Sequence, residues 1–388
     1  MTRLVWLLAG EASGDALGAR LMAALLRRAP DTAFAGVGGP LMQAQGLESL
    51  FPMEELSLMG LVEVVPALFR LRRLLRRAAA DIAERRPDAV VTIDSPGFAL
   101  RLLRAIRPLG VKRAHYVAPQ VWAWREGRVR HYPGLWERLL CLLPFEPAFF
   151  ARHGLAATFV GHPVLESGLA GGDAERFRAA HGLPPEAKVL LVLPGSRPGE
   201  VARHARIFGE SIAALLSAHP GLQPVVPAAP AVREMLSGAL AGWPVRPILI
   251  QSEAAKPDAY AAASAALCKS GTSALELALA GVPMVVAYRF NPITGFLARR
   301  LAKVPYASLI NLLAGHEVVP EILQEQCTPE RLTAALDGLL SDPRKAAAQR
   351  AAFGPVLASL APGSGTPSEA AAEAILEMIG ANLPRPSG

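Results

Sequence analysis

Cysteine is scarce in this chain of 388 residues, and its placement excludes two common kinds of covalent or metal stabilisation. Cys141, Cys268 and Cys327 are the three cysteines, and they lie far apart in the sequence. No CxxC pair occurs, and no histidine stands at a spacing typical of zinc. We therefore expect three buried free thiols, with neither a disulfide framework nor a zinc site.

Long hydrophobic runs are also missing. No uninterrupted apolar run approaches the roughly 18 residues that a membrane-spanning helix needs. The first residues, MTRLVWLLAGEASGD, resemble a signal peptide only superficially, because Glu11 and Asp15 stand where the small residues of a cleavage site would be. We interpret this stretch as a buried first strand and place the protein in the cytosol. A hydrophobic content of 52% excludes a largely disordered chain.

Acidic residues are outnumbered, and the formal net charge is +7. Such an excess indicates an anionic partner: a phosphorylated small molecule, a nucleic acid or an acidic membrane face. Arg supplies most of the positive charge, and its planar guanidinium suits bidentate phosphate contact. The richness in Ala and Arg is equally compatible with the base composition of the genome, so the charge alone does not choose among these partners.

Short apolar runs alternate with helical patterns along the whole chain, which is typical of α/β folds with parallel sheets covered on both faces. The segments RLVWLLAGEASGD and KVLLVLPGSRPGE each read as a strand, a glycine turn and a helix, so we predict two similar domains. We predict a boundary between Gly161-His162-Pro163 and Gly171-Gly172-Asp173, a last helix over Ser368–Ile379 and a frayed tail. The predicted strands are Leu4–Ala9, Ala33–Val37, Ala89–Ile93, Ala114–Val117, Leu139–Leu143, Thr158–Val160, Val189–Leu193, Leu222–Val226, Ile248–Ile250, Ala265–Cys268 and Met284–Ala287.

The loops that follow the strands of the first half carry candidate site residues, because open α/β sheets bind ligands at the carboxyl ends of their strands. Glu11 would project from the glycine turn after the first strand, unless that turn is an ordinary one capped by Ser13. Asp94 follows another strand, and Ser95 before Pro96 is the natural helix cap. Asp94 is thus either a general base for a hydroxyl or a structural acid bonded to loop amides.

The segment HYVAPQVWAWR, from His115 to Arg125, places two Trp and one Arg after a strand, and Arg128 and Arg130 follow closely. These side chains could form a wall that stacks on a sugar and binds a phosphate. They could equally be two core Trp beside a solvated basic helix.

In the second half, Pro194-Gly195-Ser196-Arg197 delivers an Arg from a strand end, and KSGTSALE follows a later strand. Ser273 and Glu276 have the spacing of a capping box. The same backbone N–H groups could instead face a phosphate, which would leave Glu276 to reach a sugar. Asn311, Glu321 and Gln324 could read sugar hydroxyls or cap loops.

The stretch from Leu58 to Arg77 differs in kind, because apolar residues recur at helical spacing while Arg70, Arg72, Arg73, Arg76 and Arg77 crowd its end. Such a segment can lie in an anionic membrane surface. The alternative is a core-packed helix with Arg stems along its flank.

Together these motifs resemble one family, the lipid-A-disaccharide synthases. The matching segments keep the family's order and span residues 9 to 327. They are AGEASGD, GVGGPLM, MGLVEV, HYVAPQVWAWR, LLPFEPAFF, FVGHPV, LPGSR, KSGTSALE, GVPMVVAYR and NLL…VVPEILQ. The resemblance implies a GT-B fold: two Rossmann-like, doubly wound parallel-sheet domains facing a cleft, with the C-terminal helix crossing back to the first domain. The implied domains are 1–168 for the acceptor, 169–350 for the UDP-sugar, and 351–388 for the returning helices and a flexible tail.

The implied reaction joins UDP-2,3-diacylglucosamine to the 6-hydroxyl of 2,3-diacylglucosamine 1-phosphate, which gives the β-1,6-linked disaccharide phosphate and UDP. It is an inverting transfer without metal or cofactor. The acylated substrates imply peripheral contact with the cytoplasmic face of the inner membrane, through about 58–77, and no nucleic-acid partner. The family also suggests exchange of the last helix in a homodimer.

By position, the resemblance makes Asp94 the candidate base and Glu11 the acid that positions the acceptor. Further expected acceptor contacts are Ser13, His115, Gln120, Trp124 and Arg125. The expected donor contacts are Ser196, Arg197, Gly271, Thr272, Ser273, Glu276, Asn311, Glu321 and Gln324.

One departure stands out from the family pattern. The family usually reads Asp-x-Pro-Asp-Phe-Asn, whereas this chain has Gly97 and Ala99 in place of the second acid and the amide. Two rival functions remain: a UDP-GlcNAc 2-epimerase, and a non-catalytic nucleotide-sugar-binding protein recruited to membrane. The absence of GxGxxG disfavours a Rossmann dehydrogenase.

Overall fold

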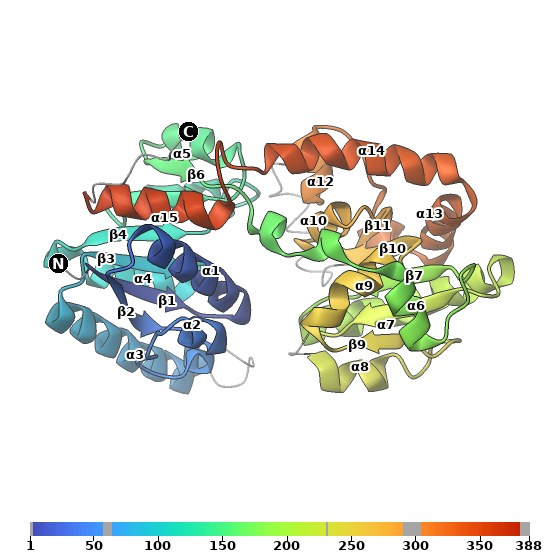
Figure 1. Cartoon of the computed structure of the whole chain (residues 1–388), viewed down its shortest axis with the longest axis horizontal. Coiled ribbons are helices and arrows are strands. Elements are labelled where there is room, and N and C mark those ends of the chain that lie inside the picture. Colours follow the sequence, from blue (N-terminus) through green and yellow to red (C-terminus); the bar gives the residue numbers. More distant parts are fainter. Residues whose placement is uncertain (1–2, 57–63, 230–231, 290–303, 381–388) are drawn as a thin grey trace. The chain divides into compact units, whose positions relative to one another are not determined.

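The computed structural model describes residues 3–56, 64–229, 232–289 and 304–380, and it divides into two compact units (Figure 1). The first unit comprises residues 1–163 together with 360–388, and the second comprises 164–359. Each unit is built on one six-stranded sheet. The predicted tail at the C-terminus and the first part of the predicted membrane segment, 58–63, lie outside the described residues.

The first sheet has the strand order β2-β1-β3-β4-β5-β6, and every pairing within it is parallel. Its central strands are continuous apolar runs buried on both faces, as the pattern of short unbroken hydrophobic segments predicts. The strands are β1 (Arg3–Ala9), β2 (Thr32–Val37), β3 (Ala89–Ile93), β4 (Lys112–Tyr116), β5 (Arg138–Cys141) and β6 (Ala157–Phe159).

The helices of the first unit include the last helix of the chain, α15 (Pro367–Met378), which packs beside α1 (Ala12–Arg28) (Figure 1). Ala371, Ala372 and Ile375 are buried on α15, and a capping box of Thr366 and Glu369 starts it. The predicted return of the C-terminal helix to the first domain is confirmed. The other helices of the unit are α2 (Pro40–Ala44), α3 (Val64–Arg85), α4 (Pro96–Ala105) and α5 (Glu146–Ala151).

The second sheet has the order β12-β11-β10-β7-β8-β9, again with parallel pairings throughout. Its strands are β7 (Val189–Leu193), β8 (Gln223–Pro227), β9 (Ile248–Ile250), β10 (Ala265–Lys269), β11 (Met284–Tyr288) and β12 (Glu321–Leu323). Its helices are α6 (Ala174–His181), α7 (Pro198–Ala218), α8 (Arg233–Ala239), α9 (Lys256–Ala261), α10 (Ser273–Leu279), α12 (Leu309–Ala314), α13 (Pro329–Ser341) and α14 (Pro343–Ser359). The eleven predicted strands all form, and only β12 was not foreseen.

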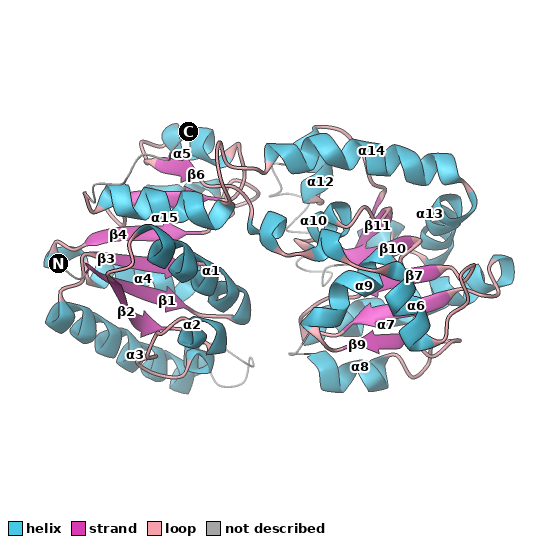
Figure 2. Cartoon of the chain, in the orientation of Figure 1, coloured by secondary structure: helices cyan, strands magenta, loops and turns pink. Residues whose placement is uncertain are grey.

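Figure 2 shows the alternation of strand and helix in both units. Together with the parallel order of both sheets, it confirms the predicted GT-B class of two doubly wound, Rossmann-like units. All three cysteines are buried free thiols, as expected. Within the described ranges, every helix is too short or too polar to cross a bilayer.

Candidate active site

The first unit has its topological switch point between β1 and β3, since the chain leaves β1 toward β2 and leaves β3 toward β4 on the other side. Ala9 pairs with Ile93 at the carboxyl ends of these two strands. Glu11 and Asp94 follow these paired residues almost at once, so the two predicted acids come from neighbouring strand ends. Gly10 also lies against the second loop, because a Cβ built on it would be 2.4 Å from the Ser95 Oγ.

Glu11 occupies the N-cap position of α1, where its side chain makes no capping bond. Glu11 and Ser13 are both exposed. The alternative in which Ser13 caps the turn is wrong, because α1 begins one residue before Ser13. This loop therefore presents a carboxylate and a hydroxyl outward from the switch point.

The backbone at Asp94 and Ser95 is left-handed, with φ of +50° and +45°. Val117, at the end of the neighbouring strand β4, has φ of +76°, which is unusual for a β-branched residue. The Asp94 N–H donates to the Tyr116 carbonyl at 2.8 Å, so the strained loop is fastened to the end of β4. Residues held in such conformations gather at functional sites. Ser95 stands at the N-cap of α4 but makes no side-chain capping bond, contrary to expectation.

Asp15 has a structural task that the sequence did not reveal. Its buried carboxylate accepts from the N–H groups of Gly39, Leu41 and Met42 at 2.9–3.0 Å, which lie at the start of α2. A carboxylate at a helix N-terminus satisfies free donors and complements the helix dipole. The motif AGEASGD thus holds the motif GVGGPLM in place.

His115, a predicted acceptor contact, is fully buried. Its Nδ1 lies 2.8 Å from the Thr92 Oγ1, and its ring stacks on Trp136 with centroids 5.7 Å apart. Burial lowers the pKa of His115 to about 4, so the ring is neutral at pH 7. His115 therefore packs under the strand ends, where the protein encloses it fully.

Of the two Trp in the segment after β4, one is exposed, as a ligand-binding wall requires, and the other is buried in the core. Trp124 is 43% exposed, and the Arg125 guanidinium lies 3.9 Å from the centroid of its ring, while Gln120 is also exposed. These three predicted acceptor residues remain available to a ligand. Trp122 is instead buried, and its Nε1 donates to the Glu146 carboxylate at 3.0 Å. Burial raises the pKa of Glu146 to about 7, although the hydrogen bonds that its carboxylate accepts from Leu143, Trp122 and Leu142 act to lower this pKa.

The switch point of the second unit lies between β7 and β10, where Leu193 pairs with Cys268. The loop after β7 carries Ser196 and Arg197, both exposed, with Arg197 at the N-cap of the long helix α7. The loop after β10 carries Gly271 and the exposed Thr272. A guanidinium, a helix N-terminus and a glycine loop therefore meet at paired strand ends, which suits a diphosphate.

Ser273 and Glu276 do not form a capping box. Helix α10 begins at Ser273 with Thr272 at the N-cap, and no side chain caps it. The Glu276 carboxylate instead accepts from the Tyr260 hydroxyl at 3.3 Å and pairs with the Lys256 Nζ at 3.2 Å. Glu276 is only half-buried, so its carboxylate could still contact a sugar, although it already binds Tyr260 and Lys256.

Asn311 and Glu321 form an internal network. The Asn311 amide nitrogen donates to the Val319 carbonyl and to the Glu321 carboxylate, both at 2.8 Å, while its oxygen accepts from Val318 and Val319. Glu321 also accepts from the N–H groups of Ala307 and Ser308.

The Ser270 hydroxyl donates to the Ala307 carbonyl at 2.7 Å. The network therefore supports the loop after β10 from behind. Gln324 has φ of +55°, and its carbonyl accepts from the Arg289 Nε.

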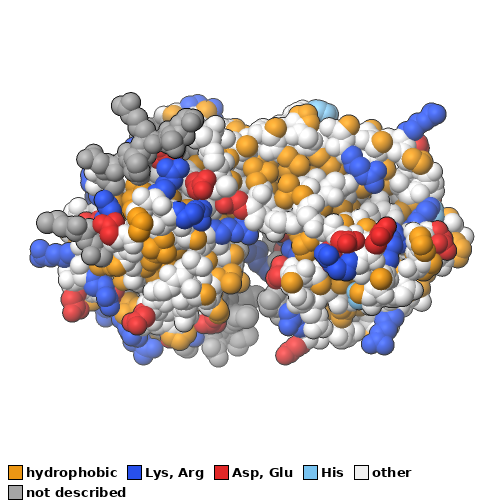
Figure 3. Space-filling model, viewed as in Figure 1, with side chains coloured by type: hydrophobic (Ala, Val, Ile, Leu, Met, Phe, Trp, Pro, Cys, Tyr) orange, Lys and Arg blue, Asp and Glu red, His pale blue; other side chains and the backbone are white. Residues whose placement is uncertain are grey.

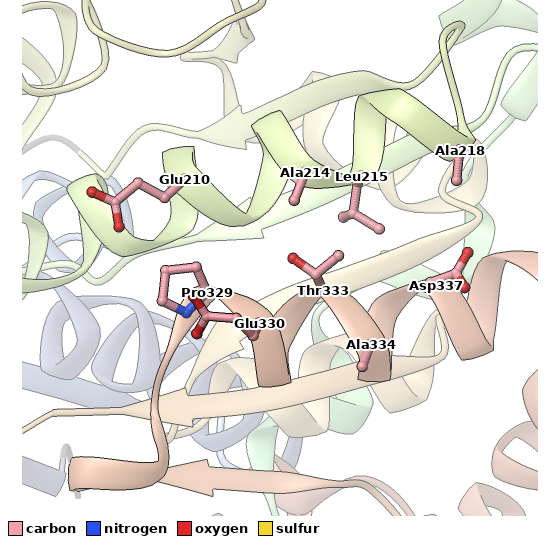
Figure 4. Close-up of a pocket in the computed structure, with 9 residues that line it drawn as sticks. All are labelled: Glu210, Ala214, Leu215, Ala218, Pro329, Glu330, Thr333, Ala334 and Asp337. Atoms are coloured by element: carbon pink, nitrogen blue, oxygen red, sulfur yellow. The ribbon is translucent and has the colours of Figure 1, made fainter.

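A groove of about 610 Å³ lies between α7 and α13, lined by Glu210, Thr333 and Asp337 among others (Figure 4). None of the predicted site residues lines it. Glu200 lies in the first turn of α7, next to the strand ends, and Glu210 lies about 15 Å further along this helix. Three carboxylates (Glu210, Glu330 and Asp337) would repel a phosphate, so this groove does not suit the donor.

Comparison with known sequences gives a consistent family. A sequence model of lipid-A-disaccharide synthetase matches residues 5–375. A lipid-A-disaccharide synthase of Gluconobacter oxydans (strain 621H) is 54% identical over 385 residues, covering 99% of this chain and 93% of the relative. Another, from Granulibacter bethesdensis, is 54% identical over 388 residues, covering 97% of this chain and 99% of the relative.

Comparison with solved structures supports the fold. The S. aureus MnaA–UDP co-structure has a TM-score of 0.67 at 14% identity, with full coverage of both chains. CalG4, the calicheamicin glycosyltransferase, has a TM-score of 0.61 at 19% identity, again with full coverage. At such identities the likeness establishes the architecture alone.

Proposed function

The chain belongs to the lipid-A-disaccharide synthase family, whose members are glycosyltransferases, and on that premise we propose its reaction in detail. It transfers 2,3-diacylglucosamine from the UDP conjugate to the 6-hydroxyl of 2,3-diacylglucosamine 1-phosphate. The supporting observation is the contrast between the two switch points. One exposes the carboxylate of Glu11 beside the strained Asp94 loop, and the other exposes Arg197 at a helix N-terminus.

The second unit suits the leaving UDP. Negative charge develops on the diphosphate as the glycosidic bond to it breaks, and fixed donors aimed at that charge lower the barrier. Arg197 supplies a permanent positive charge, while Gly271, with φ of +158°, lets the backbone approach closely. Glu276 remains the proposed ribose contact, through a carboxylate that Lys256 and Tyr260 hold in place.

The first unit suits the acceptor. Asp94 accepts the proton of the 6-hydroxyl as that oxygen attacks the anomeric carbon, which inverts the configuration there. Glu11 and Ser13 orient the acceptor sugar, and Trp124 with Arg125 offers a stacking surface and a cation for its phosphate. Apart from the neighbouring residues and backbone of its own helix, no described atom lies within 4 Å of a Cβ built on Gly97. A side chain would therefore fit at this position, and the second acid of the family pattern is absent only because this sequence has Gly there.

The purified protein should convert the two acylated glucosamine substrates to UDP and the disaccharide phosphate, measured by mass spectrometry. Each substrate alone should give no disaccharide. UDP-GlcNAc alone should remain unchanged, since an epimerase would yield its 2-epimer. Epimer without disaccharide would overturn the proposed reaction in favour of the rival enzyme, and UDP binding without turnover would favour the non-catalytic one.

Membrane contact of α3 belongs to the same proposal. Leu74, Ala78 and Ile82 bury one stripe of this helix, while Phe69 is 66% exposed among arginines. Among the described residues no carboxylate pairs with Arg70, Arg72, Arg73, Arg76 or Arg77. Figure 3 shows the side of the first unit on which α1 and α15 lie, where basic and acidic side chains are mixed. Ion pairs join these two helices at Arg27–Glu369 and Arg28–Glu373. Unpaired arginines beside an exposed Phe favour an anionic lipid surface.

Replacing Arg72 and Arg76 together with Gln should weaken binding to phosphatidylglycerol-containing vesicles about 30-fold, at about 1 kcal/mol for each cation. Flotation or tryptophan fluorescence titration measures the affinity. The matched control replaces the exposed Arg331 and Arg344, which removes the same charge from the second unit. Equal weakening by both double variants would mean that total charge, and not α3, determines binding.

A further inference from the structure

We propose that Glu200 is a positioning residue: it holds the two loops that bind the donor diphosphate and does not contact the diphosphate itself. The assignment rests on the proposed function of the second unit. Glu200 lies in the first turn of α7 and is only 4% exposed. It lies directly behind the Ser196-Arg197 loop that the proposal assigns to UDP.

The Glu200 carboxylate joins the two sides of the switch point. One oxygen accepts from the Ser196 N–H at 3.1 Å, in the loop after β7. The other accepts from the Lys269 Nζ at 3.1 Å, at the carboxyl end of β10. A single side chain thus sets the separation of the two loops between which a diphosphate would lie.

Both loops press closely on this ion pair. Gly195 has φ of +135°, and a Cβ built on it would lie 2.4 Å from the Glu200 Cβ. A Cβ on Gly271 would lie 3.2 Å from the Lys269 Nζ. A side chain at Gly195 would therefore collide with Glu200, and one at Gly271 would crowd Lys269, so these two glycines let both loops lie close to the pair.

The carboxylate is held in its charged form. Burial opposes that charge, but Lys269, the Ser196 N–H and Arg197 together hold the pKa of Glu200 below its usual value. Because Glu200 neutralises Lys269, this lysine adds little net positive charge to the site, whereas the neighbouring Arg197 is exposed. Removing one partner of such a buried pair leaves the other charge uncompensated.

A second side chain on the same face of α7 fastens the next strand. The His204 Nδ1 lies 2.9 Å from the Pro194 carbonyl, and its Nε2 accepts from the Arg289 N–H at 3.0 Å. The ring must be neutral, with the proton on Nδ1, to make both bonds. The burial that lowers the pKa of His204 favours this state. Helix α7 therefore braces the ends of β7, β10 and β11 together.

The test compares Glu200→Gln with Glu210→Gln, which lies on the same helix and pairs with Arg206 in an exposed site. We expect Glu200→Gln to weaken UDP binding about tenfold, the equivalent of one charge-assisted hydrogen bond, and to raise the donor KM alike. The acceptor KM should stay within about twofold, since only the donor loops move. Calorimetry at a temperature where both variants are folded gives the UDP affinity.

An unchanged UDP affinity in folded Glu200→Gln would overturn the proposal, because a merely structural role would lower only the melting temperature. If that variant does not fold, Glu200→Gln with Lys269→Gln keeps a neutral hydrogen bond between the loops, and its UDP affinity should stay within about twofold of that of the unmodified protein. A loss of about tenfold in this double variant would mean that the charges, and not the separation of the loops, govern UDP binding, and would overturn the proposal. The proposed reaction can fail separately: Glu200-dependent UDP binding without disaccharide would retain the positioning role and refute the transfer.

Discussion

Asp94→Asn should lower kcat by about a thousandfold, within the range that a general base contributes, while the affinity for UDP stays unchanged. The amide has the shape of the carboxylate but cannot take up the proton of the acceptor hydroxyl. Asn also tolerates left-handed backbone, so the φ of +50° at this position adds no new strain. Asp94→Ala would be a poorer test, since Ala in this conformation is strained.

Kinetics with saturating donor and a separate UDP titration distinguish chemistry from binding. UDP is assigned to the second unit, whereas Asp94 belongs to the first, so the two measurements should separate. Glu11→Gln is the matched comparison, because the proposed function assigns Glu11 to orienting the sugar and not to proton transfer, and its main effect should be on the acceptor KM. Equal losses in kcat and UDP affinity for Asp94→Asn would refute the assignment of Asp94 as base.

Most strands could be predicted because they are short apolar runs, and the central ones are buried on both faces. β12 escaped prediction because Glu321-Ile322-Leu323 begins with a carboxylate and has only two apolar residues, so it forms no apolar run of its own. Glu321, the first residue of β12, is held by the Asn311 amide and by the N–H groups of Ala307 and Ser308, which come 10 to 14 positions earlier in the chain. Such a contact leaves no periodic signal in the chain.

The sequence predicts where the loops of the candidate site lie, but it does not predict which of their residues are exposed to a ligand and which are buried. Glu11, Arg197 and Thr272 are exposed at switch points, where the strand pattern predicts them. His115 and Asn311 belong to other motifs of the same family pattern, but they are fully buried. A motif contains both residues that could contact a ligand and residues that shape the loop. The sequence does not distinguish the two kinds, whereas their burial in the structure does. Asp15 shows the converse, since its capping of α2 depends on a contact between two motifs.

Asn311→Asp is expected to destabilise the protein severely, even without ligand. The change replaces the amide NH₂, 2.8 Å from the Glu321 carboxylate, by a second carboxylate oxygen in a fully buried site. Two acids at that distance cannot both ionise, and an uncompensated buried charge costs about 3–5 kcal/mol. The melting temperature should fall by about 10 °C near pH 8.

The pH dependence gives the mechanism. Repulsion raises the pKa of the introduced carboxyl, so the folded state binds a proton more tightly than the unfolded chain does. The loss should therefore be largest above that raised pKa and should shrink as pH falls toward about 5, where the two acids share a proton. Thermal unfolding from pH 5 to 8 measures this slope. Asn311→Asp with Glu321→Gln exchanges the amide and the acid and should regain part of the loss at pH 8. A fall that is equal at all pH values, and is not relieved by the exchange, would show that the fit of the amide and not charge repulsion governs this site.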